Sequence, residues 1–136
     1  MVKSAIGTVQ ANPAALINTT LGLELSPTSG TVPFTVQVGG YLLRADNAAG
    51  VGGKTIYIYR RKQGTTTWTQ IGTATTLSAP SQVHDKGWYG YADYLDVAAV
   101  YEYQSEFKGD STYAGCESPL REVAEKKEPW GCGDEW

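Results

Sequence analysis

The residues that could carry out catalytic chemistry are few and scattered. His84 is the only imidazole in the chain, and it lies in the polar stretch Ser81-Gln82-Val83-His84-Asp85. A catalytic serine needs a base beside it, and the sequence contains no G-x-S-x-G nucleophile elbow. Asp93, Asp96 and Glu102 could pair for acid–base catalysis, but no pattern places two of them in one cleft. We therefore expect His84 to be a solvated loop residue and the protein not to be an enzyme.

Side-chain oxygens in the expected loops could bind one kind of ion, calcium. Asp46, Asn47, Asp96 and Asp110 are hard oxygen ligands, and the loops at one end of a β-sandwich could bring them together. The sequence has no EF-hand spacing, and turn-forming Asp and Asn residues explain the same composition. A zinc site would need about four ligands, which one histidine and two separated cysteines do not supply. We expect no cofactor, with calcium left open as an alternative.

The charge and glycine distributions argue against two other ligand classes. The formal net charge is −3 and the pI about 5.1, so the chain lacks the basic footprint of a nucleic-acid-binding protein. The only basic cluster, Arg60-Arg61-Lys62, is short and reads as a solvated strand end. The glycine-rich stretch 50–54 precedes a strand, so it does not present a helix N-terminus to a phosphate.

Aromatic residues give the strongest hint of a binding face. Trp88, Tyr89 and Tyr91 lie close together in one expected strand, whose alternation sends some rings inward and some outward. An exposed set of such rings could stack on sugars or contact a protein, whereas buried rings would fill a small core. Tyr101 or Tyr103 could form the tyrosine corner that closes immunoglobulin-like sandwiches.

The two ends of the chain carry residues that a single sandwich does not need. Apolar and β-prone residues at the N-terminus could dock on a partner or add a strand to a neighbouring sheet. Two tryptophans in the polar C-terminal tail could anchor it to a partner. The candidate assembly residues are Ile6, Val9, Leu16, Ile17, Trp130 and Trp136.

The cysteines and the N-terminus bear on location. Cys116 and Cys132 could form a disulfide in an oxidising environment, or remain two thiols in a reducing one. Gly7, Thr8 and Gln10 interrupt the apolar core that a signal peptide needs. No stretch approaches the roughly 18–20 apolar residues of a membrane span. We expect a virion or an extracellular, cell-surface location.

The elements that must position these residues are strands. Apolar and polar residues alternate in successive short segments, which glycine, proline and asparagine turns separate. No convincing amphipathic helix interrupts them, and 77–86 reads as irregular. About seven antiparallel strands in one small domain predict an all-β immunoglobulin-like sandwich. The expected strands are 21–25, 34–43, 55–59, 68–76, 88–95, 100–108 and 113–123.

Three stretches of the sequence resemble a known family. Leu23-Glu24-Leu25-Ser26-Pro27-Thr28-Ser29-Gly30-Thr31-Val32-Pro33-Phe34-Thr35-Val36, Gly53-Lys54-Thr55-Ile56-Tyr57-Ile58-Tyr59 and Tyr101-Glu102-Tyr103-Gln104-Ser105-Glu106-Phe107-Lys108-Gly109-Asp110-Ser111-Thr112-Tyr113-Ala114-Gly115 are similar to prokaryotic Ig-like repeats of the group-3 bacterial kind. The resemblance covers roughly 21–118 and implies an immunoglobulin-like fold. It departs from the family at 77–86, which is longer than the usual link, and at both termini. Such repeats typically stand in tandem on surface proteins, adhesins and extracellular enzymes, whereas this chain has one copy.

These observations predict three regions and a structural role. We expect an N-terminal extension over 1–20, a sandwich over 21–118, and the end of the last strand with a tail over 119–136. The predicted function is a non-enzymatic structural protein that builds or attaches to a larger assembly, such as a capsid, a phage tail or a surface filament, through its terminal segments. The alternative is a carbohydrate-binding or adhesive module that uses Trp88, Tyr89 and Tyr91.

Overall fold

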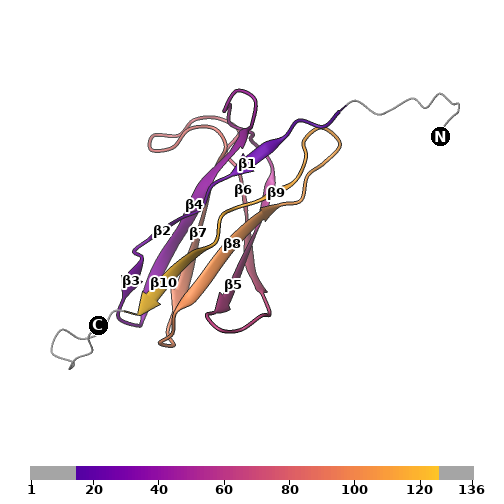
Figure 1. The fold of residues 1–136 in the computed structure, drawn as a ribbon. Helices are drawn as coiled ribbons and strands as arrows, with labels where there is room; N and C mark the ends of the chain where they lie inside the picture. The colour runs from indigo at the N-terminus through magenta and orange to yellow at the C-terminus, as the bar shows by residue number, and fades with distance from the viewer. Residues whose placement is uncertain (1–14, 126–136) are drawn as a thin grey trace, which may run out of the picture.

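The computed structural model describes residues 15–125, and these residues form an all-β sandwich of two sheets (Figure 1). The strands follow the alternation of apolar and polar residues in the sequence. The ten strands are β1 (Thr19–Leu21), β2 (Glu24–Ser26), β3 (Ser29–Gly30), β4 (Phe34–Arg44), β5 (Thr55–Lys62), β6 (Thr69–Thr75), β7 (Trp88–Leu95), β8 (Tyr101–Phe107), β9 (Cys116–Glu117) and β10 (Arg121–Glu125).

The first sheet is built around β4. On one side β4 pairs with β7 over its first eight residues, and on the other side it pairs with β2 and then β1. All three pairings are antiparallel. The second sheet has the order β3-β10-β8-β5-β6, with β9 also paired to β8, and only the short β3–β10 pairing is parallel. The two sheets therefore use strands from both halves of the chain, which ties the sandwich together.

The core lies between the two sheets and takes alternate residues from each strand. On β8, Tyr101, Tyr103, Ser105 and Phe107 share one face of the strand and are all buried. On β5, Ile56 and Ile58 are buried while Tyr57 and Tyr59 lie on the outer face. The remaining large buried residues, among them one leucine in β1, one in β2 and one between these strands, complete one continuous cluster. They are Leu21, Leu23, Leu25, Val36, Val38, Leu42, Val51, Tyr89, Leu95 and Val123.

Two predicted boundaries differ from the structure. Ile17 bridges Tyr113, and β1 begins at Thr19, so 17–20 pairs within the sandwich although it falls in the range predicted as an extension. The predicted last strand over 113–123 is split, because Cys116–Glu117 and Arg121–Glu125 pair with different parts of β8. The burial of Val123 against the core explains why the chain stays in the sheet as far as residue 125.

A tyrosine closes the connection between β7 and β8. The Tyr101 hydroxyl donates a hydrogen bond of 2.6 Å to the carbonyl oxygen of Val97, four residues upstream. Tyr101 thus makes the bond of a tyrosine corner. The Tyr103 hydroxyl instead bonds Asp93, so of the two predicted candidates it is Tyr101 that makes the corner.

The described chain begins and ends at opposite ends of the sandwich (Figure 1). Residue 17 bridges Tyr113 in the β8–β9 connection, at the end that also holds the loop between β4 and β5. Residue 125 pairs with Gly30 at the other end, where Tyr101 begins β8. Partners joined to the two termini of this sandwich would therefore lie on opposite sides of it, along its long axis.

Candidate functional site

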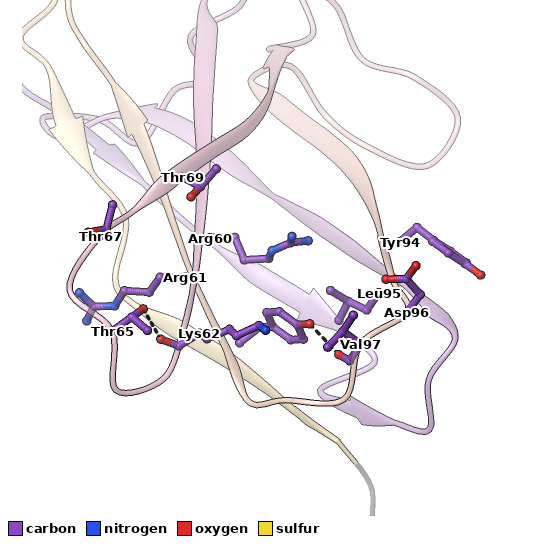
Figure 2. A pocket seen from close by; sticks show the side chains of 11 residues that line it. Arg60, Arg61, Lys62, Thr65, Thr67, Thr69, Tyr94, Leu95, Asp96 and Val97 are labelled. Atoms are coloured by element: carbon purple, nitrogen blue, oxygen red, sulfur yellow. Dashed lines mark hydrogen bonds between the residues drawn. The ribbon is translucent and has the colours of Figure 1, made fainter.

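A hollow of the described surface lies at the end where β10 leaves the sandwich. It has a volume of about 560 Å³ and opens between the β5–β6 hairpin and the turn after β7. Figure 2 shows Arg60 and Lys62 extending from β5 toward the segment that carries Leu95 and Val97. We call it the end hollow. It is lined by Arg60, Arg61, Lys62, Thr65, Thr67, Thr69, Tyr94, Leu95, Asp96, Val97 and Tyr101.

Arg60 is fixed in this hollow by a buried acidic partner. Its Nη1 donates a hydrogen bond of 2.7 Å to Oδ2 of Asp93, and the Tyr103 hydroxyl donates to the same oxygen at 2.6 Å. The guanidinium also lies over the Tyr101 ring, 5.1 Å from its centroid. Burial and the adjacent Asp93 carboxylate both raise the pKa of Tyr103, which therefore stays neutral and donates. Arg60 is thus held in place before any partner arrives.

Arg61 is held in a similar way on the neighbouring outer face. Its Nε donates to Oε1 of Glu102 at 2.7 Å, and its guanidinium stacks 4.2 Å from the Trp68 ring centroid. Lys62 and Asp96 differ, because both are exposed and neither forms an ion pair with any other described residue. The end hollow therefore offers one cation and one anion that remain available for an external partner.

The rim of the end hollow exposes apolar surface. Tyr94 is 61% exposed and Val97 is 51% exposed. Protein interfaces are enriched in Tyr, Trp and Arg, and pre-ordered arginines lose little side-chain entropy on binding. No nucleophile with an adjacent base lines the hollow. Its chemistry suits a protein contact.

The predicted sugar platform does not form as a shared face. Tyr89 is fully buried; its hydroxyl donates to the carbonyl of Gly22 at 2.8 Å, and burial raises its pKa to about 12. Tyr91 also points inward, and its hydroxyl donates to the carbonyl of Ile71. Of these three residues, only Trp88 lies on the outer face of the sheet, so Tyr89 and Tyr91 cannot join it in stacking on a sugar.

Trp88 itself is enclosed by two other aromatic rings. His84 stacks on the indole with 3.8 Å between ring centroids and 7° between ring planes. Tyr41 meets it edge-on at 5.1 Å, and the indole passes over Gly39, where a Cβ would come within 2.4 Å. His84 is therefore a partly buried packing residue and not a solvated one. The serine nearby in sequence, Ser81, hydrogen-bonds the main chain of His84.

The predicted carboxylates do not meet in one place. Asp93 is buried against Arg60, Glu102 bonds Arg61, and Asp96 lies at the end hollow. Asp46 instead pairs with Arg44, and Asp110 with Lys54, near the opposite end of the sandwich.

The predicted calcium ligands are therefore not a ligand set. Asp46 and Asp110 are each committed to a cation, and the Asn47 side chain accepts from the amide of Ala49. Within residues 15–125, no group of three or more His, Cys, Asp or Glu is placed to hold a metal ion. Asp96 is separated from the other three because it follows β7, at the other end of the sheet.

Asp110 supports a prediction about acid stability. Its carboxylate accepts from Lys54 Nζ at 2.6 Å and from the amides of Thr112 and Tyr113, which lowers its pKa to about 2. Because the pKa is lower in the folded state, this stabilisation is present above about pH 4 and is lost as the pH falls toward 2. We expect the melting temperatures of the wild type and Asp110→Asn to differ most above pH 4 and to converge near pH 2. A constant difference from pH 2 to 6 would contradict this.

Some of the remaining predicted site residues lie within the described residues 15–125 and the others lie outside them. Leu16 is 47% exposed, and Ile17 is half-buried and hydrogen-bonded to the main chain of the β8–β9 connection. The Cys116 thiol lies half-buried, 3.1 Å from Thr19 Oγ1, and burial raises its pKa. The other predicted residues lie outside the described range, and with them the predicted disulfide. They are Ile6, Val9, Trp130, Cys132 and Trp136.

Sequence reasoning did not identify the end hollow. The run Arg60-Arg61-Lys62 was visible, but its arginines looked merely solvated because their partners lie more than 30 residues away. The usable signal was the pair of apolar residues at the end of an expected strand, Tyr94 and Val97, on either side of Asp96.

No family model matches the chain, and no curated protein sequence matches it. The described part of the chain contains no helix with the length and hydrophobicity needed to cross a bilayer.

Proposed function

We propose that the protein is a non-enzymatic structural module with an immunoglobulin-like fold, which builds or attaches to a larger assembly. The order of its strands supports the fold, because β4 pairs with β7 in one sheet while β8 lies between β5 and β10 in the other. The tyrosine corner of Tyr101 adds to this support. Resemblance to bacterial Ig-like repeats points the same way.

The observation that carries the proposal is the axial arrangement of the sandwich. The described chain starts at one end and finishes at the other, beside a hollow with ordered arginines and exposed apolar rims (Figures 1 and 2). Such a domain can contact one partner at each end, so that the two partners and the domain lie along one line. The location that fits is a virion or a surface filament, with the terminal segments and the ends of the sandwich as the contact surfaces.

The carbohydrate-binding alternative has weaker support. It needs an open aromatic face, and the His84 ring covers one face of the Trp88 indole. No second exposed ring lies beside Trp88 among the described residues of its strand, because Tyr89 and Tyr91 point inward.

The test is the solution mass of the full chain over a wide concentration range, measured by light scattering. We expect mass to rise with concentration, and to rise less in a version without residues 1–14 if these contribute a joining segment. A full chain that stays monomeric throughout would overturn self-assembly as the function.

A further inference from the structure

The connection between β6 and β7 projects from the body of the sandwich (Figure 1). It includes residues 77–87, and within it 77–86 is the stretch that is longer than the usual link in the family that the sequence resembles. We call it the 77–87 loop. Its tip carries Val83, which is 78% exposed and is the most exposed of the large apolar residues described.

The base of the 77–87 loop is firmly attached to the sandwich. The amide of Gly87 donates a hydrogen bond of 2.9 Å to the carbonyl oxygen of Leu77. The amide of Leu77 in turn donates to the carbonyl oxygen of Trp88, also at 2.9 Å. The amide of Asp85 donates to the Tyr41 hydroxyl at 3.2 Å, and the His84 ring stacks on Trp88. The loop therefore has a fixed orientation relative to the first sheet.

The tip of the loop is a closed turn. The Ser81 amide donates to the carbonyl of His84 at 2.7 Å, while Ser81 Oγ accepts from the amide of His84 at 3.0 Å. This turn holds Val83 in water and does not let it fold back on the core. Exposing a large apolar side chain on an ordered turn is unfavourable for an isolated domain and favourable for one that docks there.

Two charged residues follow the exposed Val83 in the chain. Asp85 and Lys86 are both exposed, and neither forms an ion pair with any described residue. The end hollow has the matching set, with exposed Tyr94 and Val97 beside the unpaired Lys62 and Asp96.

The two matching surfaces lie at opposite ends of the same two strands. The 77–87 loop lies between the end of β6 at Thr75 and the start of β7 at Trp88. The end hollow is formed by residues just before β6 and around the end of β7. One copy cannot bring them together, but two copies placed end to end can.

We propose that the 77–87 loop of one copy inserts into the end hollow of a second copy. Val83 packs against Tyr94 and Val97, Asp85 pairs with Lys62, and Lys86 pairs with Asp96. Because the contact joins two different surfaces at opposite ends, each copy can bind one further copy at each end, which extends the assembly as a filament unless the rotation between copies closes a ring. This inference rests on the proposed function and deepens it, since it names the partner and the contact.

The first test removes the apolar contact in the full chain. We expect Val83→Asp to weaken self-association by about tenfold or more, because it places a charge against an apolar rim. Gln82→Asp is the matched control, since it adds the same charge at the neighbouring exposed position and should have a smaller effect. Circular dichroism and the unfolding midpoint show whether both variants remain folded.

The second test reverses a proposed ion pair. Lys62→Glu and Asp85→Lys should each weaken association, because each brings two like charges together across the contact. The double variant restores opposite charges, so we expect it to associate nearly as well as the wild type. Sedimentation velocity on all four proteins at one salt concentration measures this.

The outcomes separate the two proposals. If the wild type associates while Val83→Asp and both charge reversals do so equally well, the end-to-end contact is wrong and self-assembly through other surfaces stands. If the wild type never associates, self-assembly as the function and the end-to-end contact both fail. Two weakened single variants without recovery in the double variant would refute the Lys62–Asp85 pairing.

Discussion

Replacing Asp93 with alanine should destabilise the fold by about 2–4 kcal/mol. Asp93 is 6% exposed and its Oδ2 accepts from both Arg60 and the Tyr103 hydroxyl. Its loss leaves a fully buried hydroxyl and a half-buried guanidinium without their acceptor, and both penalties add to the cavity left behind. Arg60 can still reach water through the end hollow, which keeps the cost below that of a fully buried charge. Urea unfolding, followed by tryptophan fluorescence, measures the change.

Glu102→Ala provides the matched comparison for Asp93→Ala. It also removes the carboxylate partner of an arginine on β5, but Glu102 faces outward and its partner Arg61 retains the stacking on Trp68. The Arg61–Glu102 pair is partly buried on the outer face of the sheet, and its removal leaves no fully buried hydroxyl without an acceptor, so this variant should lose about 1 kcal/mol, less than Asp93→Ala. Equal losses of unfolding free energy in the two variants would show that the buried Arg60–Asp93–Tyr103 network stabilises the fold no more than the outer Arg61–Glu102 pair does.

Replacing Gly87 with alanine should destabilise the protein by about 2–4 kcal/mol. Gly87 has a φ of 97°, a region that residues with a Cβ rarely adopt. A Cβ at this position would lie 2.7 Å from the carbonyl oxygen of Leu42 and 2.9 Å from Cα of Gly50. Both neighbours are main-chain atoms, so β4 or the β4–β5 loop must move. The measurement is the change in unfolding free energy.

Gly64→Ala separates the strain in φ from the clash. Gly64 has a similar φ of 90°, but no atom lies within 4 Å of a Cβ built there. It should therefore cost only about 1–2 kcal/mol, the penalty of the backbone conformation alone. If the two variants lose the same stability, contact with Leu42 and Gly50 contributes nothing and the prediction for Gly87 is wrong.

The sequence predicted the parts of the fold that depend on local alternation. The strands expected at 55–59 and 100–108 are present as β5 and β8, because each strand buries one face and pleating fixes which residues share it. Gly64 and Gly109 fall between expected strands, and both have a positive φ in the structure.

The parts that the sequence could not predict depend on contacts between distant residues. Alternation could not say which aromatic residues of β7 face the core, because both of its faces carry large rings. The buried role of Asp93 was missed because its partner Arg60 lies 33 residues away. The place of 17–20 in the sandwich was missed because these residues pair with the rest of the chain through main-chain groups, which leave no pattern in side-chain types.

The placement of β1 and β10 has a mechanical consequence. β1 starts at one end of the sandwich and runs inward, while β10 runs outward and finishes at the other end, in the opposite sheet. Tension applied at residues 15 and 125 would pull each strand along its own length. The hydrogen bonds of both strands lie across that direction, so they would be loaded together in shear and not broken one at a time. A row of such domains under stretch would resist extension until a whole terminal strand slides free.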